Sequence, residues 1–368
     1  MSTVAPVPST TPKEAEAFVG RLFEGALGTV DLLTLYIGDR LGLYRALKDG
    51  GPATPSELAS RCSINQRYAR EWLEQQAVGG ILMVDDASAP EDARRYALPE
   101  GHALALTDPE SPFSMAPLAR AFVGCALALP KILDAFRTGG GVPWSDFGTD
   151  AIEAQGDFNR PWLLSSFGTE YLPLIGDVHQ RLQAEPPAHV ADFACGVGWA
   201  SIAIASAYPK AIVHGFDLDE SSIEIARKNA SERGLSDRVT FEVRDIAGSS
   251  LEGGYDLVVV IEAIHDLSRP VEALRSIHKV LAPGGCAIVA DEKTADFFAA
   301  PGDDLERLFY GFSVLCCLPA GMSEQPSAGT GTVMRADTMR SYATEAGFSD
   351  VEVLDIPHDL LRFYRLTP

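Results

Sequence analysis

A short stretch that begins at Asp192 carries the residue types best suited to hold a ligand. An apolar run from Val190 ends in this acid, and two glycines, Gly196 and Gly198, precede a helix-like segment that begins at Trp199. Glycines allow a sharp turn and let the backbone lie directly against a ligand. The first N–H groups of a helix can then bind a carboxylate or a phosphate. The stretch therefore predicts a strand, a tight turn and a helix that together bind an anionic group.

A second carboxylate follows the next apolar run, residues 211–216, which ends at Asp217. An acid at the end of the second strand of such a unit can accept hydrogen bonds from both hydroxyls of a ribose. Asp217 and the glycine turn together indicate a cofactor that contains a nucleoside.

His265, Asp291 and Glu292 are the candidates for acid–base chemistry. His265 follows the apolar run 255–263, and Asp291 and Glu292 come at the end of the run 285–291. The carboxyl ends of strands face the ligand in open α/β sheets, which places this imidazole close to a reacting group. An imidazole with a pKa near neutrality can remove a hydroxyl proton, and a carboxylate can accept its other N–H. Helix capping and simple contact with a cofactor are the alternatives for His265.

Strands and helices alternate from residue 189 onward, which predicts a parallel sheet with helices on both faces. Only residues 357–359 separate the last two strands. That gap is too short for a parallel crossover, so these strands must form an antiparallel hairpin. The predicted strands are residues 189–194, 211–218, 239–245, 255–263, 285–291, 351–356 and 360–366, and the predicted helices are 200–208, 219–233, 269–281 and 336–346.

The N-terminal part resembles a winged helix, because three helices are followed by a hairpin. Thr54, Pro55 and Glu57 have the capping-box pattern that starts the second helix. The predicted helices are residues 18–47, 55–61 and 65–78, and the predicted strands are 81–84 and 95–98. We divide the chain into a winged-helix domain (1–108), a mostly helical region (109–187) and an α/β domain (188–368).

Composition excludes several classes of protein. The net charge of −21 over 368 residues disfavours non-specific binding to nucleic acid or to an anionic membrane. The six cysteines form no C-x-x-C pair, so neither a zinc site nor a disulfide framework is indicated, and a reducing cytoplasm is expected. No apolar run reaches the roughly 20 residues that span a bilayer, and residues 1–12 read as a loose tail without the features of a signal peptide.

Two cofactors remain possible from the glycine turn alone. The sequence G-x-G-x-x-S from Gly196 nearly matches the dinucleotide fingerprint, and Asp217 lies at a suitable distance for the ribose of NAD. An NAD-dependent oxidoreductase is therefore one alternative. A lone match of this kind is a weak signal.

Three features favour S-adenosylmethionine. The pattern D-x-A-x-G-x-G from Asp192 resembles motif I of class I S-adenosylmethionine-dependent methyltransferases, D/E-x-G-x-G-x-G. Asp245 ends the third strand, where that family places an acid against the adenine amino group. An antiparallel pair of strands at the C-terminus distinguishes the methyltransferase fold from the dinucleotide-binding fold. Residues 281–285 also have the L-x-P-G-G turn of the methyltransferase family. Ala194 replaces the first glycine of the motif, and we expect only a slight shift of the turn.

The resemblance implies a Rossmann-like class I methyltransferase sheet of seven strands, with S-adenosylmethionine as the cofactor. It implies that the loop after Asp192 lines the methionine and ribose, that Asp217 binds the ribose, and that Asp245 and Ile246 hold the adenine. Capping of a helix or turn is the alternative for Asp217 and Asp245. The candidate cofactor-binding residues are Asp192, Ala194, Cys195, Gly196, Gly198, Asp217, Leu218, Asp245, Ile246 and Glu262, and no metal is expected.

The I-H-D-L sequence around His265 resembles the H-D-W turn of plant-type small-molecule O-methyltransferases, whose histidine is the general base. Their N-terminal domain is a winged helix that mediates dimerisation. The resemblance implies methyl transfer to a small molecule, with His265 as the candidate base and Asp291 and Glu292 orienting it. It leaves the acceptor, and the choice between O-, N- and C-methylation, undetermined. Aromatic residues that are candidates for an acceptor pocket are Trp144, Phe158, Trp162, Phe309, Tyr310 and Phe312.

A winged helix also occurs in transcription regulators, so a metabolite-sensing regulator is a further alternative. Residues 1–110 contain ten Lys or Arg against sixteen Asp or Glu. DNA binding depends on cations that neutralise phosphates, so this excess of acids favours a homodimerisation domain.

Overall fold

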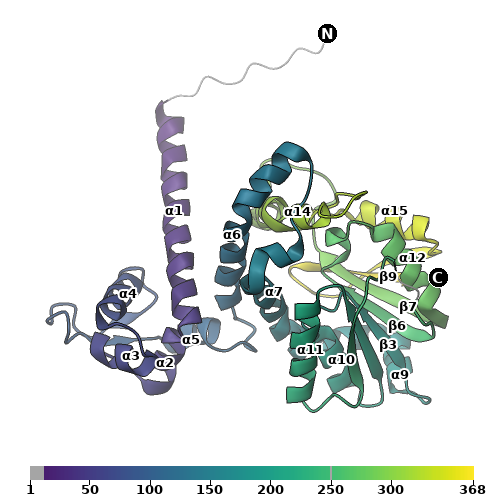
Figure 1. Ribbon diagram of the computed structural model, residues 1–368, viewed down its shortest axis with the longest axis horizontal. Helices are drawn as coiled ribbons and strands as arrows, with labels where there is room; N and C mark the ends of the chain where they lie inside the picture. Colours follow the sequence, from purple (N-terminus) through teal and green to yellow (C-terminus); the bar gives the residue numbers. More distant parts are fainter. Residues whose placement is uncertain (1–11, 249–250) are drawn as a thin grey trace, which may run out of the picture. The chain divides into compact units, whose positions relative to one another are not determined.

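Seven strands form one sheet in the computed structural model of the chain, which describes residues 12–248 and 251–368 (Figure 1). The chain divides into two units, Met1–Ala119 and Arg120–Pro368, and the sheet belongs to the second unit. All seven predicted strands of this sheet are present, with shifted ends. They are β3 (His189–Phe193), β4 (Ile212–Asp217), β5 (Val239–Val243), β6 (Tyr255–Ile261), β7 (Leu281–Glu292), β8 (Asp350–Leu354) and β9 (Leu361–Thr367).

The strand order is β5-β4-β3-β6-β7-β9-β8. The first five strands pair in parallel, and β9 runs antiparallel to both of its neighbours. The predicted antiparallel pair at the end of the chain is therefore confirmed. β9 lies inside the sheet, where Tyr364 stands opposite Val289 of β7 and Val353 of β8.

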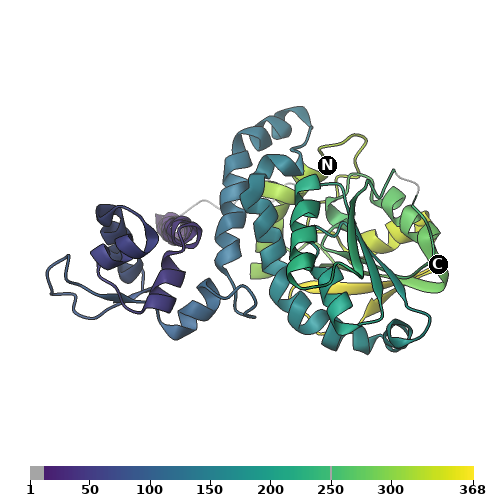
Figure 2. The ribbon, with the colours of Figure 1, turned by 60° about the horizontal axis from the view of Figure 1, so that its bottom comes forward.

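Each face of the sheet carries its own hydrophobic core. Leu257 and Val259 of β6 belong to one core, and Val258 and Val260 belong to the other, because successive side chains of a strand point to opposite faces. Helices cover both faces, and Figure 2 shows the sheet between them. The first face is covered by α9 (Gly176–Gln183), α10 (Trp199–Ala207) and α11 (Glu220–Glu232), and the second by α12 (Pro270–Val280) and α15 (Ala336–Ala346).

The region before the sheet is helical, as predicted. It consists of α6 (Ala116–Thr138), a 3-10 turn η1 (Trp144–Phe147), α7 (Gly148–Trp162), a π-helical segment η2 (Leu163–Tyr171), α8 (Leu172–Leu174) and α9. Among the described residues, α6 alone is long and apolar enough to cross a membrane, a criterion that buried core helices also meet. Cys125, Ala128 and Ile132 of this helix pack into a local core with Phe147.

Further helices follow β7. They are α13 (Asp304–Phe312), a π-helical segment η4 (Ser313–Cys317) and α14 (Leu318–Gly321). Pro319 stands in the first turn of α14, where its fixed φ favours a helix.

The first unit contains the predicted helices and hairpin. Thr54 forms the capping box with Glu57, and Asn65 caps the next helix. The predicted long helix is broken at Gly42, whose φ of 66° is left-handed, and the helix over 100–106 was not predicted. The elements are α1 (Pro12–Arg40), α2 (Leu43–Gly50), α3 (Pro55–Cys62), α4 (Gln66–Val78), β1 (Met83–Val84), β2 (Tyr96–Ala97) and α5 (Glu100–Leu106).

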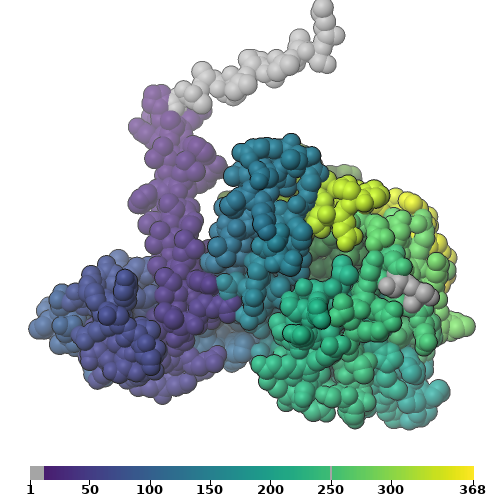
Figure 3. Space-filling view, viewed as in Figure 1, coloured from purple at the N-terminus to yellow at the C-terminus, as the bar shows by residue number. Residues whose placement is uncertain are grey.

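Helix α1 buries only Gly38. The space-filling view shows most of its length projecting from the other helices of the first unit (Figure 3). Its large apolar side chains recur every three or four residues, so they line one side of the helix. They include Val19, Phe23, Leu27, Val30, Leu33 and Ile37, each at least 45% exposed, and Phe18 and Leu22 of the same helix are exposed to a similar extent.

Candidate functional site

The glycine turn lies between β3 and α10, at the carboxyl edge of the sheet. Gly196 and Gly198 have φ of 51° and 84°, and Gly198 is the N-cap of α10. A Cβ on Gly198 would lie 2.6 Å from the Phe241 ring, whereas one on Gly196 would meet no atom within 4 Å. Ala194 also adopts a positive φ, 54°, so the turn keeps a left-handed conformation although a side chain is present. The loop is thus packed against the sheet on one side and open beyond Gly196.

Asp192 lies beneath this loop and is only 1% exposed. One of its carboxylate oxygens accepts hydrogen bonds from the backbone N–H and the hydroxyl of Ser201, at 3.0 and 2.6 Å. Burial raises the pKa of Asp192 to about 7. Asp192 therefore fastens the first turn of α10 to β3.

Asp217 reaches the glycine turn from the end of β4. Its Oδ2 accepts the Gly196 N–H at 2.8 Å, and its Oδ1 accepts the Asp219 N–H at 2.9 Å. The cap of α11 is Asp219, whose side chain accepts the Ser222 N–H. Burial raises the pKa of the Asp217 carboxyl. Leu218, next to it, is 60% exposed and offers an apolar surface beside the loop.

Asp245 and Ile246 follow β5, as predicted. The Asp245 carboxylate accepts the Ala247 N–H at 2.8 Å and pairs with Arg269 at 2.9 Å. Ile246 is buried. Asp245 thus stabilises the turn after β5 through Oδ1, which is the kind of role that the capping alternative describes, while Oδ2 links the turn to Arg269 before α12. Cys195 stands inside the glycine turn, and burial raises the pKa of its thiol well above the ordinary value.

His265 lies in a 3-10 turn, η3 (Ile264–Asp266), that follows β6, and it is 2% exposed. Its Nδ1 is 2.6 Å from Asp291 Oδ1 and 3.0 Å from Glu292 Oε2, at the end of β7. Its Nε2 is 3.2 Å from Asp266 Oδ1. The structure therefore brings together the three residues that the sequence singled out for acid–base chemistry, and adds Asp266.

The charges of this cluster are strongly coupled. Burial lowers the pKa of an imidazole, but Asp266, Asp291 and Glu292 outweigh it, so the pKa of His265 lies well above its ordinary value. Burial raises the pKa of Glu292, whereas the contact with His265 overrides burial at Asp291 and lowers the pKa of that carboxyl. Asp291 therefore carries the negative charge that faces the imidazolium.

Two groups of possible metal ligands share His265. Their donor atoms lie within 4.8 Å of one another in His265, Asp266 and Cys317, and in His265, Asp291 and Glu292. The imidazolium offsets the negative charge of Asp291, the carboxylate whose pKa it lowers. Cys317 comes from η4, about 50 residues along the chain, so its position beside His265 had no signal in the sequence.

Glu262 precedes η3, and its backbone has a φ of 50°. Its Oε2 accepts hydrogen bonds from the side-chain amides of Gln155, at 2.9 Å, and Asn159, both in α7. The sequence indicated Glu262 but neither amide, because α7 is more than 100 residues away along the chain.

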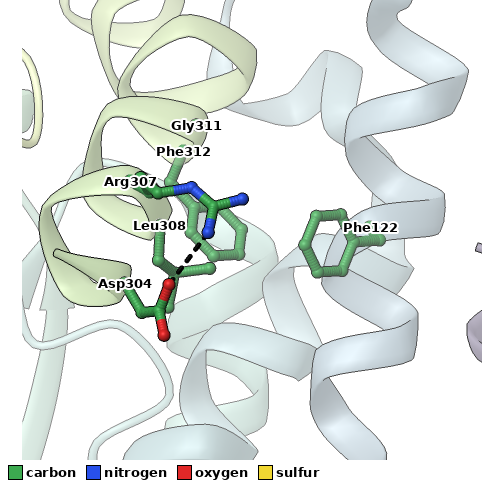
Figure 4. Close-up of a pocket in the computed structure, with 6 residues that line it drawn as sticks. All are labelled: Phe122, Asp304, Arg307, Leu308, Gly311 and Phe312. Atoms are coloured by element: carbon green, nitrogen blue, oxygen red, sulfur yellow. Dashed lines mark hydrogen bonds and ion pairs between the residues drawn. The ribbon is translucent and has the colours of Figure 1, made fainter. Parts of the chain in front are cut away.

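A surface pocket of about 360 Å³ lies between α6 and α13. Figure 4 shows Phe122 of α6 facing Leu308 and Phe312 of α13 across it, with an ion pair between Arg307 and Asp304 beside them. Of the aromatic residues proposed for an acceptor pocket, Phe312 lines this one. Phe309 is buried. Trp144 packs against two hydrophobic cores, the local core that contains Phe147 and the core on the first face of the sheet.

Comparisons with known proteins agree with this architecture. Residues 185–317 match the family model "Methyltransferase domain", and residues 29–108 match "Rv2258c-like winged HTH domain". An O-methyltransferase of Pyrenophora dematioidea is 28% identical over 205 residues, which are 54% of this chain and 68% of that protein. Methyltransferase GfsG of Streptomyces halstedii is 29% identical over 115 residues, and the match spans 41% of its length.

Solved structures share the whole fold. Human N-acetylserotonin methyltransferase in complex with SAM is 17% identical, with a TM-score of 0.71 over 98% of this chain and 99% of that one. Mitomycin 7-O-methyltransferase is 21% identical, with a TM-score of 0.66 over 96% and 97% of the two chains. These likenesses confirm the predicted fold class, with its seven-stranded sheet and N-terminal winged-helix domain.

Proposed function

We propose that this chain, an S-adenosylmethionine-dependent methyltransferase with an N-terminal winged-helix domain, transfers the methyl group to a hydroxyl of a small molecule. The observation that supports O-methylation is the position of His265. It follows β6, the strand that pairs with β3, so the turn that carries it leaves the same edge of the sheet as the glycine turn, and Asp291 bonds its Nδ1.

The residues at the sheet edge fit the cofactor. The turn is open beyond Gly196, and the exposed Leu218 and the carboxylates of Asp217 and Asp245 lie at the ends of neighbouring strands. We propose that the loop lines the methionine and ribose, that Asp217 binds the ribose hydroxyls, and that Leu218, Asp245 and Ile246 hold the adenine. Bound S-adenosylmethionine would supply the methyl group from its sulfonium sulfur. That sulfur leaves as a neutral thioether, so it needs no proton from the protein.

The protein must remove the proton of the acceptor hydroxyl. In our proposal, His265 receives it on Nε2, while Asp291 holds Nδ1–H and stabilises the imidazolium that forms. Glu292 Oε2 lies 3.0 Å from Nδ1 and adds a second carboxyl group on that side of the ring. Because the carboxylates raise the pKa of His265, the neutral base is favoured at alkaline pH or when a positive charge arrives beside the ring.

Loss of the base tests this mechanism. With labelled S-adenosylmethionine and a panel of phenols and other hydroxylated acceptors, His265→Ala should lower turnover about 10²–10⁴-fold. Its affinity for S-adenosylhomocysteine, measured by calorimetry, should stay close to that of the wild type. Undiminished turnover of a hydroxyl acceptor by His265→Ala at neutral pH would refute the assignment of the base.

We further propose that the protein is a homodimer formed through its first unit. The exposed apolar side of α1 supports a second copy of this chain as the partner, since such a stripe is costly to leave in water. A role in DNA binding is less well supported, because Arg67 and Arg70 of α4 pair with Glu71 and Glu91. A cytoplasmic location is proposed on the six unpaired thiols.

A further inference from the structure

Glu262 occupies a strained position at the carboxyl edge of the sheet. Its φ of 50° lies in the left-handed region, which is unusual for a residue with a Cβ. Such strain persists only where the surrounding structure holds it, and it occurs frequently at functional sites. The strain turns the chain from β6 into η3, beside the glycine turn that follows β3.

Helix α7 holds the Glu262 side chain with two amides. Gln155 and Asn159 both donate to Oε2. The orientation of the Asn159 amide follows from Trp162, whose indole N–H can only donate and which bonds Asn159 Oδ1 at 2.9 Å. The Asn159 nitrogen must therefore face Glu262. Asn159 is buried, whereas Gln155 is exposed, so only the Asn159 contact is shielded from water.

The same helix also touches the glycine turn. A Cβ on Gly156 would lie 2.1 Å from a methyl carbon of Val197, so only glycine lets α7 approach the loop this closely. Gly156 stands between Gln155 and Asn159. One short segment of α7 therefore contacts both Val197 in the loop after β3 and Glu262 after β6.

The Glu262 carboxylate has neutral amide donors, and the His265 imidazolium, which bonds Asp291, acts on it only through space. Within the described part of the chain, no lysine or arginine pairs with Glu262, and only Oε2 accepts the amides. Burial raises the pKa of Glu262, although the Asn159 amide and the charge of His265 act in the opposite direction. Oε1 is left to receive a further donor, and a cationic donor would stabilise the ionised carboxylate. A ligand ammonium group satisfies both requirements, because it supplies N–H donors and a positive charge.

We propose that Glu262 binds the α-ammonium group of the methionine portion of S-adenosylmethionine, and that Asn159 and Gln155 are positioning residues for its carboxylate. This inference rests on the proposed function only in that the glycine turn lines the methionine end of the cofactor. According to this proposal, α7 positions the group that binds the amino-acid portion of the cofactor, which takes no part in methyl transfer.

The experiment compares two ligands by calorimetry on the full-length protein. S-Adenosylhomocysteine carries the amino-acid tail, and 5′-methylthioadenosine lacks it. Glu262→Gln should weaken S-adenosylhomocysteine on the order of ten- to a hundredfold, as expected for a hydrogen bond to a charged group, and should leave methylthioadenosine within about twofold. Glu170→Gln, an exposed glutamate of η2, is the matched control and should change neither affinity.

A double-mutant cycle tests the positioning role. Asn159→Ala should weaken S-adenosylhomocysteine by a smaller factor, about three- to tenfold, and should have no further effect in the Glu262→Gln background. Equal losses of the two ligands in Glu262→Gln, or additive losses in the double variant, would overturn the inference. A wild-type protein that binds neither ligand would instead refute the cofactor site as a whole.

Discussion

Replacing Asp291 by Asn isolates the charge that holds the His265 imidazolium. Asparagine has nearly the same size as aspartate and keeps an oxygen that can accept the Nδ1–H, but it carries no charge. In the wild type the two atoms are 2.6 Å apart and both side chains are buried, so solvent screens their attraction little. The pKa of His265 should therefore fall in Asp291→Asn.

The size of this fall follows from the geometry. An opposite charge at this range shifts a pKa by about 1–3 units, which corresponds to about 1.4–4 kcal/mol. Asp266, at 3.2 Å from Nε2, remains in the variant and retains part of the upward shift. Because only the neutral imidazole can accept a proton, the acidic limb of a kcat profile should move to lower pH by the same number of units.

The assay is a histidine NMR titration, from about pH 5 to about pH 11, on protein labelled at the imidazole carbons. The His265 resonance is assigned by its loss in His265→Asn, and thermal unfolding checks that each variant is folded. A wild-type His265 that titrates at or below its ordinary value would refute the electrostatic reasoning. A pKa that is the same in Asp291→Asn and in the wild type would show that another group sets it.

Three further predictions test the cofactor loop and the exposed helix. Asp217→Ala should weaken S-adenosylhomocysteine by roughly 1.5–3 kcal/mol in calorimetry, because it removes a charged hydrogen-bond acceptor, and unchanged affinity would exclude Asp217 from the site. Gly198→Ala should weaken binding of the same ligand more than Gly196→Ala does, because only the Cβ added at position 198 meets the Phe241 ring. A larger loss of affinity in Gly196→Ala than in Gly198→Ala would contradict this packing of the turn. Phe23→Glu combined with Leu27→Glu should convert a dimer into a monomer of about 39 kDa in light scattering, and a wild type that is already monomeric would refute the proposed dimer.

The sheet was predictable because its signals are local. Apolar runs of strand length, turn residues and the short gap at 357–359 each constrain a neighbouring element, and together they leave few topologies. The same holds for Thr54 and Asn65, whose caps depend on residues two or three positions away. The break at Gly42 escaped prediction because the apolar period continues across it, and only the left-handed backbone separates α1 from α2.

The site was predictable only where the sheet itself positions it. His265, Asp291 and Glu292 follow adjacent parallel strands, so their proximity results from the strand order. Gln155, Asn159 and Cys317 reach the same edge from helices whose packing no periodicity reveals. Asp192 differs, since the sequence indicated its position before the glycine turn but not that its side chain bonds Ser201 beneath the loop. Motif spacing locates a residue along the chain, and tertiary packing decides which way its side chain points.

The interior position of β9 has a consequence for synthesis of this protein. β7 can pair with β6 as soon as both have left the ribosome, but its other edge stays unpaired until residues 361–367 have been made. That edge includes Ala287, Ile288, Val289 and Ala290, all fully buried in the finished fold. An apolar strand with an open edge pairs readily with other chains, so nascent or prematurely terminated polypeptides should depend on chaperones that shield β7.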